Sequence, residues 1–217
     1  MGMGFSAAMS VLRVTSGPMD TNCYLVGDSA SGEALIVDAP WGVLSPLLEK
    51  IRVGSWHPIY LVLTHGHWDH VAAASDLRAA LDVAIAAHRL EGPALEAPAE
   101  TLYQVPFEIP SIHADRLLED GATLDVGALR FHILHTPGHS PGAICLYEPD
   151  AKLLLSGDTL FHNGYGRTDL PGADEETLWR SLTRLSALPD DVRILPGHGV
   201  ETTIGTEAWM RRIPADL

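Results

Sequence analysis

The run HGHWDH at residues 65–70 constrains this chain more than any other feature of its sequence. The apolar residues 59–63, which indicate a buried strand, are separated from it by Thr64 alone. The run precedes residues 71–81, whose apolar side chains recur at helical spacing. A lone histidine is usually structural, but three imidazoles and a carboxylate gathered at a strand end need polar partners. The run therefore predicts a metal site that follows a buried strand.

Three further candidate ligands lie in loops that follow predicted strands. They are His139 in HTPGH, Asp158 in SGDT and His198 in PGHG. A glycine beside each one lets the backbone turn sharply and approach the site closely. The full set of candidate ligands is His65, His67, Asp69, His70, His139, Asp158 and His198.

Imidazoles and carboxylates together form a donor set that suits divalent transition metals, zinc first, with iron or manganese as alternatives. The positive charge of two divalent ions would exceed the negative charge of two carboxylates and one hydroxide. The excess charge would stabilise an oxyanion. The candidate ligands are therefore suited to metal-dependent catalysis.

The hydrophobic pattern predicts the α+β class. Short apolar runs bounded by Gly, Pro and Asp predict strands at residues 11–14, 23–26, 34–37, 59–63, 123–126, 129–134, 143–147, 153–155 and 192–195. Helical spacing predicts helices over residues 43–51, 71–81 and 178–185, the last with Asp174 as its N-cap. Helices follow groups of strands rather than each strand, which favours packed sheets over a doubly wound parallel sheet. The Pro-rich residues 91–110 give no clear pattern.

Composition narrows the class of protein. The 217 residues are 46% hydrophobic, which fits one sizeable packed domain, and no apolar run is long enough to span a bilayer. The net charge of −14 disfavours a nucleic-acid partner. Cys23 and Cys145 each lie in an apolar run and are predicted to be buried thiols. We expect a cytoplasmic protein with no membrane or nucleic-acid partner.

The order of HxHxDH followed by His, Asp and His resembles the metallo-β-lactamase superfamily, over about residues 22–204. The resemblance implies an αββα four-layer sandwich with two metal ions at one edge. It implies one metal ion on His65, His67 and His139, and a second on Asp69, His70 and His198, with Asp158 bridging both. It also implies that Asp38 supports a metal-binding histidine from behind.

A bridged pair of metal ions implies hydrolysis. Two cations that share one water lower its pKa enough to supply hydroxide near neutral pH, and that hydroxide attacks a carbonyl carbon. Asp69 is the predicted catalytic residue, because a carboxylate beside the second metal can take or relay a proton.

Within the superfamily, three stretches resemble the short bacterial type of the glyoxalase II-like hydroxyacylglutathione hydrolases. They are NCYL at residues 22–25, SGDTLF at residues 156–161 and GYGRTDLPG at residues 164–172. The resemblance implies hydrolysis of a small acyl-thioester such as hydroxyacylglutathione. Few residues follow His198, so we expect a single domain over residues 1–217, without the C-terminal helical domain that holds glutathione in the longer enzymes.

Two substrate contacts are less specific. Arg167 is predicted either to contact a substrate carboxylate or to form an ion pair with Asp169. Tyr165 is predicted either to reach the substrate or to pack. The longer enzymes contact glutathione through aromatic residues, and this chain has Asp169 and Val200 at the nearest positions. The identity of the thiol carrier therefore stays open.

Other activities of the same fold remain alternatives. A persulfide dioxygenase would use a single iron on His65, His139 and Asp158, and a lactone hydrolase would use the same hydroxide. Zinc β-lactamases of the best-known branch carry a cysteine at the position of Asp158, which disfavours drug hydrolysis. The complete second set of ligands favours the hydrolase over the dioxygenase.

Overall fold

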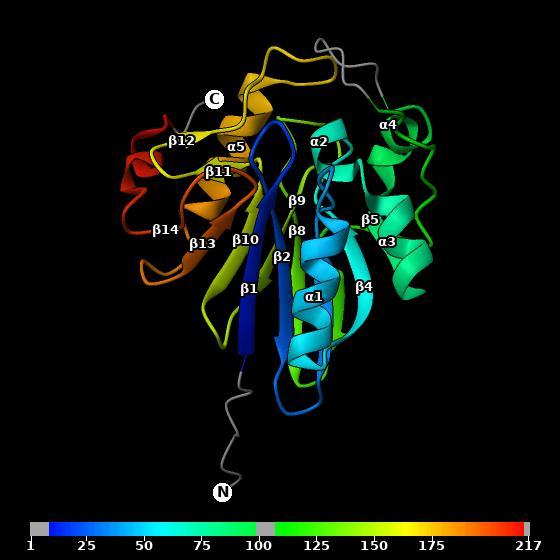
Figure 1. Ribbon diagram of the computed structural model, residues 1–217. Helices are drawn as coiled ribbons and strands as arrows, with labels where there is room; N and C mark the ends of the chain where they lie inside the picture. The colour runs from blue at the N-terminus through cyan, green and yellow to red at the C-terminus, as the bar shows by residue number, and fades with distance from the viewer. Residues whose placement is uncertain (1–8, 99–106, 215–217) are drawn as a thin grey trace, which may run out of the picture.

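Two six-stranded sheets face each other in the computed structural model, which describes residues 9–98 and 107–214, and helices cover the outer faces of both (Figure 1). The first sheet contains, in spatial order, β1 (Met9–Ser16), β2 (Thr21–Asp28), β3 (Glu33–Val37), β4 (His57–Leu63), β5 (Ala84–His88) and β6 (Arg116–Leu118). The second contains β14 (Thr202–Thr203), β13 (Arg193–Pro196), β10 (Leu153–Gly157), β9 (Ile144–Glu148), β8 (Leu129–His135) and β7 (Thr123–Val126).

The remaining elements are helices and one short hairpin. The helices are α1 (Leu44–Gly54), α2 (Trp68–Val71), α3 (Ala74–Leu81), α4 (Gly92–Glu96) and α5 (Glu175–Leu185), with the 3₁₀ turns η1 (Arg89–Glu91) and η2 (Ala208–Arg212). The hairpin pairs β11 (Leu160–Phe161) with β12 (Gly164–Tyr165).

Three hydrophobic clusters separate the layers. The first, which includes Leu47 and Leu77, packs α1 and α3 against the outer face of the first sheet. The second, which includes Phe131, lies between the two sheets, and the third packs Leu178 and Leu182 of α5 against the second sheet. Alternating side chains on each strand serve both faces of its sheet. The result is the predicted α+β sandwich with its four αββα layers.

Parallel pairing brings strand ends to one edge. β3 pairs in parallel with β4, and β4 with β5, while β10 pairs in parallel with β13 in the other sheet. Parallel neighbours need crossover connections, which α1 and the α2–α3 segment provide. The loops that follow β3, β4, β10 and β13 therefore begin at one edge of the sandwich. The candidate ligands lie at this edge.

The predicted strands and helices are present, with three differences. The expected helix over residues 71–81 is broken at Ala73, whose N–H donates to the carbonyl of Ala39 rather than continuing the helical ladder. The pattern did not predict β5, β6, the hairpin strands β11 and β12, or β14. The Pro-rich segment contains α4, and its residues 99–106 lie outside the described part of the chain.

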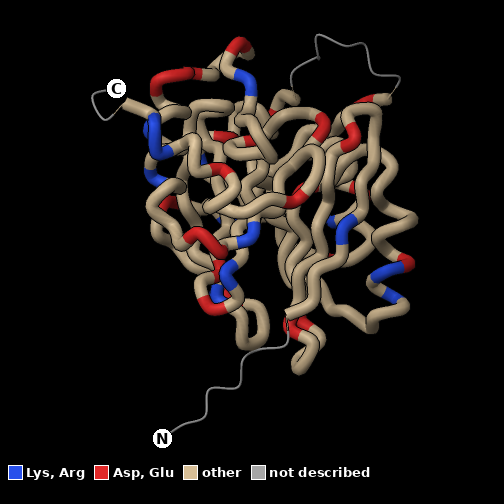
Figure 2. The backbone as a smooth tube through the Cα atoms, turned by 90° about the vertical axis from the view of Figure 1, so that its left-hand side faces the viewer, with Lys and Arg blue, Asp and Glu red and all other residues tan. Residues whose placement is uncertain are grey.

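Figure 2 shows acidic and basic positions interspersed on the loops of the face that it presents.

Within the described residues, 9–98 and 107–214, no helix has the length and apolar character needed to cross a membrane. Cys23 and Cys145 are buried free thiols, as predicted.

Candidate metal centre

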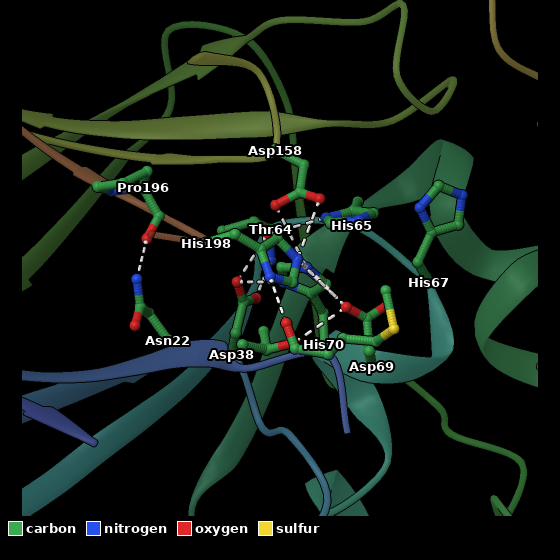
Figure 3. Close-up of polar contacts among 12 residues, drawn as sticks. Asn22, Asp38, Thr64, His65, His67, Asp69, His70, Asp158, Pro196 and His198 are labelled. Atoms are coloured by element: carbon green, nitrogen blue, oxygen red, sulfur yellow. Dashed lines mark hydrogen bonds and ion pairs between the residues drawn. The ribbon is translucent and has the colours of Figure 1, made fainter. Parts of the chain in front are cut away.

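The seven predicted ligands converge at one edge of the sandwich. His65 follows β4 after one residue, Thr64, and the rest of the HxHxDH run leads into α2. Asp158 follows β10 and His198 follows β13, and these two loops are tied together because Gly197 N–H donates to the carbonyl of Gly157 at 2.8 Å. Figure 3 shows the Asp158 carboxylate reaching down from the second sheet toward the residues of the first.

The donor atoms fall into three overlapping groups. Within each group the candidate ligand atoms lie within 4.8 Å of one another. The groups are His65, His67 and His139; His65, His70 and Asp158; and Asp69, His70 and His198. The first and third groups match the two sets that the resemblance implied, and the middle group joins them through Asp158.

Asp158 contacts histidines of both sets. Its Oδ1 lies 3.3 Å from Nε2 of His70, while its Oδ2 lies 3.4 Å from Nε2 of His198 and 3.6 Å from Nε2 of His139. A carboxylate between two groups of imidazoles can serve both, which is the geometry that a bridging ligand requires.

Four of the five histidines have Nδ1 occupied by a hydrogen bond, which leaves Nε2 for a metal. His70 Nδ1 donates to Asp38 Oδ2 at 2.8 Å, His139 Nδ1 to the carbonyl of Arg167 at 2.8 Å, and His198 Nδ1 to the carbonyl of Met19 at 3.0 Å. His65 Nδ1 lies 3.0 Å from Thr64 Oγ1, whose own proton goes to Asp38. Such partners set the tautomer of a ligating imidazole.

Two buried atoms in the site lack a hydrogen-bond partner among the described residues, His65 Nε2 and Asp158 Oδ1. Buried polar atoms are normally satisfied, so an orphaned pair that faces the same cluster calls for a further ligand. His67 Nδ1 and His139 Nε2 also face each other at 2.8 Å, and His70 Nε2 faces His198 Nε2 at 3.2 Å. These converging ring nitrogens fit divalent cations.

The charges of the metal-free site are divided between the two sets. Burial is the main cause that lowers the pKa of His65 well below its ordinary value, with neighbouring histidines adding to it, and burial likewise lowers the pKa of His67 to about 4. Burial also opposes protonation of His70, but three carboxylates outweigh it and raise the pKa of His70 well above its ordinary value. His65 and His67 are thus neutral, whereas His70 is paired with carboxylates.

Asp38 supports the site from behind the second set. It is buried, it follows β3, and it adopts the left-handed conformation with φ of 62°. Its carboxylate accepts hydrogen bonds from the N–H and hydroxyl of Thr64 at 2.8 and 2.9 Å in addition to that from His70. Asp tolerates this backbone region better than most residues. Asp38 therefore orients the His70 ring through its Nδ1.

Asp69, the predicted catalytic residue, remains partly accessible, with its side chain 13% exposed. Its Oδ2 accepts a hydrogen bond from the Thr21 hydroxyl at 3.0 Å and lies 3.2 Å from Nε2 of His198. Burial raises its pKa, but His70 and His198 outweigh burial and lower the pKa of Asp69 to about 2. At neutral pH it is therefore an ionised acceptor.

The two predicted substrate contacts are engaged with neighbours. Arg167 Nε and Nη2 donate to the two carboxylate oxygens of Asp169 at 2.6 and 2.7 Å. The Tyr165 ring packs against Trp179 and Trp209, with ring centroids 4.8 and 5.9 Å apart. These contacts favour the ion-pair and packing alternatives for the two side chains.

Sequence reasoning missed Thr21 and Thr64. Both are buried hydroxyl residues that hydrogen-bond carboxylates of the site. Thr64 could have been found because it is the residue between a buried strand and the first candidate ligand. Thr21 lies far from Asp69 in sequence, and no local signal links the two.

Comparison with known proteins places the chain in a family. A model of the metallo-beta-lactamase superfamily matches residues 16–198. The hydroxyacylglutathione hydrolase GloC of Haemophilus influenzae is 39% identical, over 92% of this chain and 94% of its own length. A probable metallo-hydrolase, YqgX of Bacillus subtilis, is 37% identical, over 90% of this chain and 92% of its own.

Solved structures agree in fold. The crystal structure of TTHA1623 in a di-iron-bound form is 39% identical, with a TM-score of 0.83 over 95% of this chain and all of that one. The B3 metallo-beta-lactamase BLEG-1 is 34% identical, with a TM-score of 0.85 over 94% of this chain and 98% of that one. The chain therefore belongs to the metallo-β-lactamase superfamily, as a metallo-hydrolase of the glyoxalase II-like short type.

Proposed function

We propose that this protein is a dinuclear metal-dependent thioesterase that hydrolyses a small acyl-thiol, with hydroxyacylglutathione as the type substrate. The observation that carries the proposal is the position of Asp158, whose two oxygens contact histidines of both ligand sets. A site of one metal would have no use for Asp69 and His198 as a second group of donors. Zinc is the metal that we propose first, with iron or manganese as alternatives.

The first set would hold one cation through His65, His67 and His139, and the second set would hold another through Asp69, His70 and His198. Divalent cations bound there supply an acidified water and an electrophile for the acyl oxygen.

The protein side chains prepare the reaction. Asp69 is ionised and partly exposed, so it can accept the proton that the attacking water releases. The Thr21 hydroxyl orients the Asp69 carboxylate by donating a hydrogen bond to its Oδ2. Asp38 keeps Nδ1 of His70 protonated and its Nε2 free. Each residue therefore has a task in binding, orientation or proton transfer.

The substrate class rests on the relatives. GloC, which is named a hydroxyacylglutathione hydrolase, matches nearly the whole of this chain. The motifs at residues 156–161 and 164–172 point to the same group. Because Arg167 is paired with Asp169, we do not propose that it selects an anionic acyl group on its own.

A β-lactam is the second candidate substrate, because BLEG-1 is named a B3 metallo-beta-lactamase and resembles this chain closely in fold. The cysteine argument applies to another branch of those enzymes, so it does not separate this chain from BLEG-1. Lactones would be attacked by the same chemistry. A single-iron persulfide dioxygenase is less favoured, because the second set of ligands is complete.

The test combines metal content with turnover. Protein purified without added metal is analysed for zinc, iron and manganese, and it is then assayed with S-lactoylglutathione, nitrocefin, a lactone and glutathione persulfide. About two metal ions per chain with thioester turnover would support the proposal. A single iron with oxygen uptake on the persulfide, or nitrocefin turnover that exceeds thioester turnover, would replace it with the corresponding alternative.

A further inference from the structure

The three histidines of the first set come from two separate loops. His65 and His67 lie in the loop between β4 and α2, whereas His139 lies in the loop between β8 and β9. The rings of His67 and His139 nevertheless face each other across 72 residues of sequence, with nitrogens 2.8 Å apart. Something must hold the two loops in register for three ring nitrogens to meet one cation.

Glu91, at the end of η1, contacts both loops. Its Oε2 accepts a hydrogen bond from Gly66 N–H at 2.7 Å. Its Oε1 accepts hydrogen bonds from the Ser140 hydroxyl at 2.8 Å and from Gly142 N–H at 2.5 Å. Gly66 lies between the two histidines of the first loop, and Ser140 directly follows His139. One carboxylate thus spans the loops that carry all three ring ligands.

The loops leave room for this carboxylate. A Cβ added at Gly66 would lie 2.7 Å from Ala94 Cβ and 2.9 Å from Glu91 Oε2, and one added at Gly142 would lie 2.8 Å from Glu91 Oε1. Real Cβ atoms avoid such distances, so either side chain would displace the carboxylate. Both glycines therefore serve the close approach of Glu91 to the two backbones.

Glu91 is also out of keeping with its surroundings. Glu91 is only 1% exposed. Burial of a carboxylate destabilises the fold unless the carboxylate is well hydrogen-bonded. Its three donors are two backbone amides and a hydroxyl, all uncharged.

We propose that Glu91 is a positioning residue for the first metal ion, because it clamps the His65–His67 loop to the His139 loop. Its loss would weaken the site on His65, His67 and His139 more than the site on Asp69, His70 and His198. The proposal rests on metal binding by the two sets and not on which substrate is hydrolysed.

Glu91→Gln is the direct test, since it keeps the size and shape of the side chain. An amide has one acceptor oxygen, so its NH₂ group must face either Gly66 N–H or the Ser140 and Gly142 donors. Zinc is titrated into chelator-stripped protein in competition with a chromophoric chelator. We expect one zinc to bind about 10- to 100-fold more weakly and the other to change by less than about 3-fold.

Two further variants assign the effect. Adding Glu91→Gln to His198→Ala, which removes a ligand of the second set, should weaken the zinc that remains. Glu148→Gln is the matched control, because Glu148 is also a buried glutamate (3% exposed), but it lies at the far end of β9 and bonds the Ala151 N–H. This control should leave both zinc affinities unchanged.

Ser140→Ala keeps the test decisive if Glu91→Gln does not fold. It removes one of the three donors and should weaken the same zinc by about 3-fold. Circular dichroism of the metal-free variants reports folding separately. The proposal is overturned if a folded Glu91→Gln protein binds both zinc ions as tightly as the parent, or if both sites weaken equally. Because no thioester is used, failure of the proposed thioesterase activity would leave this result unaffected.

Discussion

Asp38 Oδ2 lies 2.8 Å from Nδ1 of His70, and both side chains are almost wholly buried. The same carboxylate accepts hydrogen bonds from the backbone and side chain of Thr64. Asp38 follows β3 and Thr64 follows β4, and these strands pair in parallel. One carboxylate therefore joins two strand ends and sets the tautomer of a predicted metal ligand.

Asp38→Asn should lower zinc affinity at the second site by about 10- to 100-fold. Asn tolerates a positive φ, so the backbone at this position is not disturbed. If its amide nitrogen faces His70, that nitrogen donates to Nδ1 and moves the ring proton to Nε2, where the metal must bind. Chelator competition on the purified variant measures the change. Unaltered affinity for both zinc ions would rule out this role of Asp38.

Asp158→Ala should reduce occupancy of both metals, whereas His198→Ala should chiefly weaken the second. The reason is that Asp158 contacts histidines of both sets, while His198 groups only with Asp69 and His70. Elemental analysis of each variant, purified alongside the parent protein, gives the stoichiometry. Full metal content and activity in Asp158→Ala would show that the bridging assignment is wrong.

The metal-free protein should lose stability as the pH rises from 6.5 to 9. Burial lowers the pKa of His198, but hydrogen bonds from its ring to Asp158 and Asp69 outweigh burial and raise that pKa to about 9. A raised histidine pKa stabilises the fold fully below the unfolded value of 6.5, and this stability is lost as the pH passes 9. A shift from 6.5 to about 9 corresponds to a contribution of about 3 kcal/mol.

Chemical unfolding of chelator-treated protein at several pH values checks this dependence. The lowered pKa values of His65 and His67 act below pH 6.5, so they leave this window unchanged. His198→Gln cannot titrate at this position and should give a flatter profile. A parent protein whose stability rises over the same range would contradict the assignment.

Both cysteines should resist thiol reagents at pH 8. Burial is the main cause that raises the pKa of Cys145 to about 11 and the pKa of Cys23 well above its ordinary value. At pH 8 about one Cys145 side chain in a thousand would be thiolate, and only the thiolate reacts. Folded protein should therefore react slowly with Ellman's reagent, and both thiols should react promptly in denaturant. Rapid reaction of native protein would show that the thiols are accessible.

Asp174→Ala should destabilise the protein by about 1 kcal/mol, which lowers Tm by roughly 2–4 °C in a chain of this size. The Asp174 side chain accepts a hydrogen bond from Thr177 N–H at 2.7 Å and so caps α5. Glu175→Ala in the same helical turn is the matched control and should change Tm by less. Calorimetry measures the Tm of the two variants, both with metal bound. Equal decreases in Tm would mean that the capping hydrogen bond adds nothing beyond the effect of a negative charge at the start of the helix.

Much of the fold could be predicted because its signals are local. The strands at residues 23–26 and 153–155 lie within β2 and β10, and Asp174 caps α5 as its position suggested. Among the missed strands, β5 and β6 pair in parallel with strands that local patterns cannot identify as their partners. The break at Ala73 depends on Ala39, which no local pattern can indicate.

The sequence by itself determined which residues carry the chemistry. Seven ligand-type side chains stand beside glycines and strand ends, where tight turns expose them. It also determined the layered α+β class, because apolar spacing decides which faces are buried.

Only the tertiary structure decided how these residues act together. Parallel pairing brings Asp158 and His198 to one edge, and packing of the two sheets sets Asp158 between two groups of imidazoles. Glu91 and Thr21 became part of the site only through contacts distant in sequence. The physical reason is that a hydrogen bond or a metal site depends on distances of a few ångströms, which the packed core and not the order of residues determines.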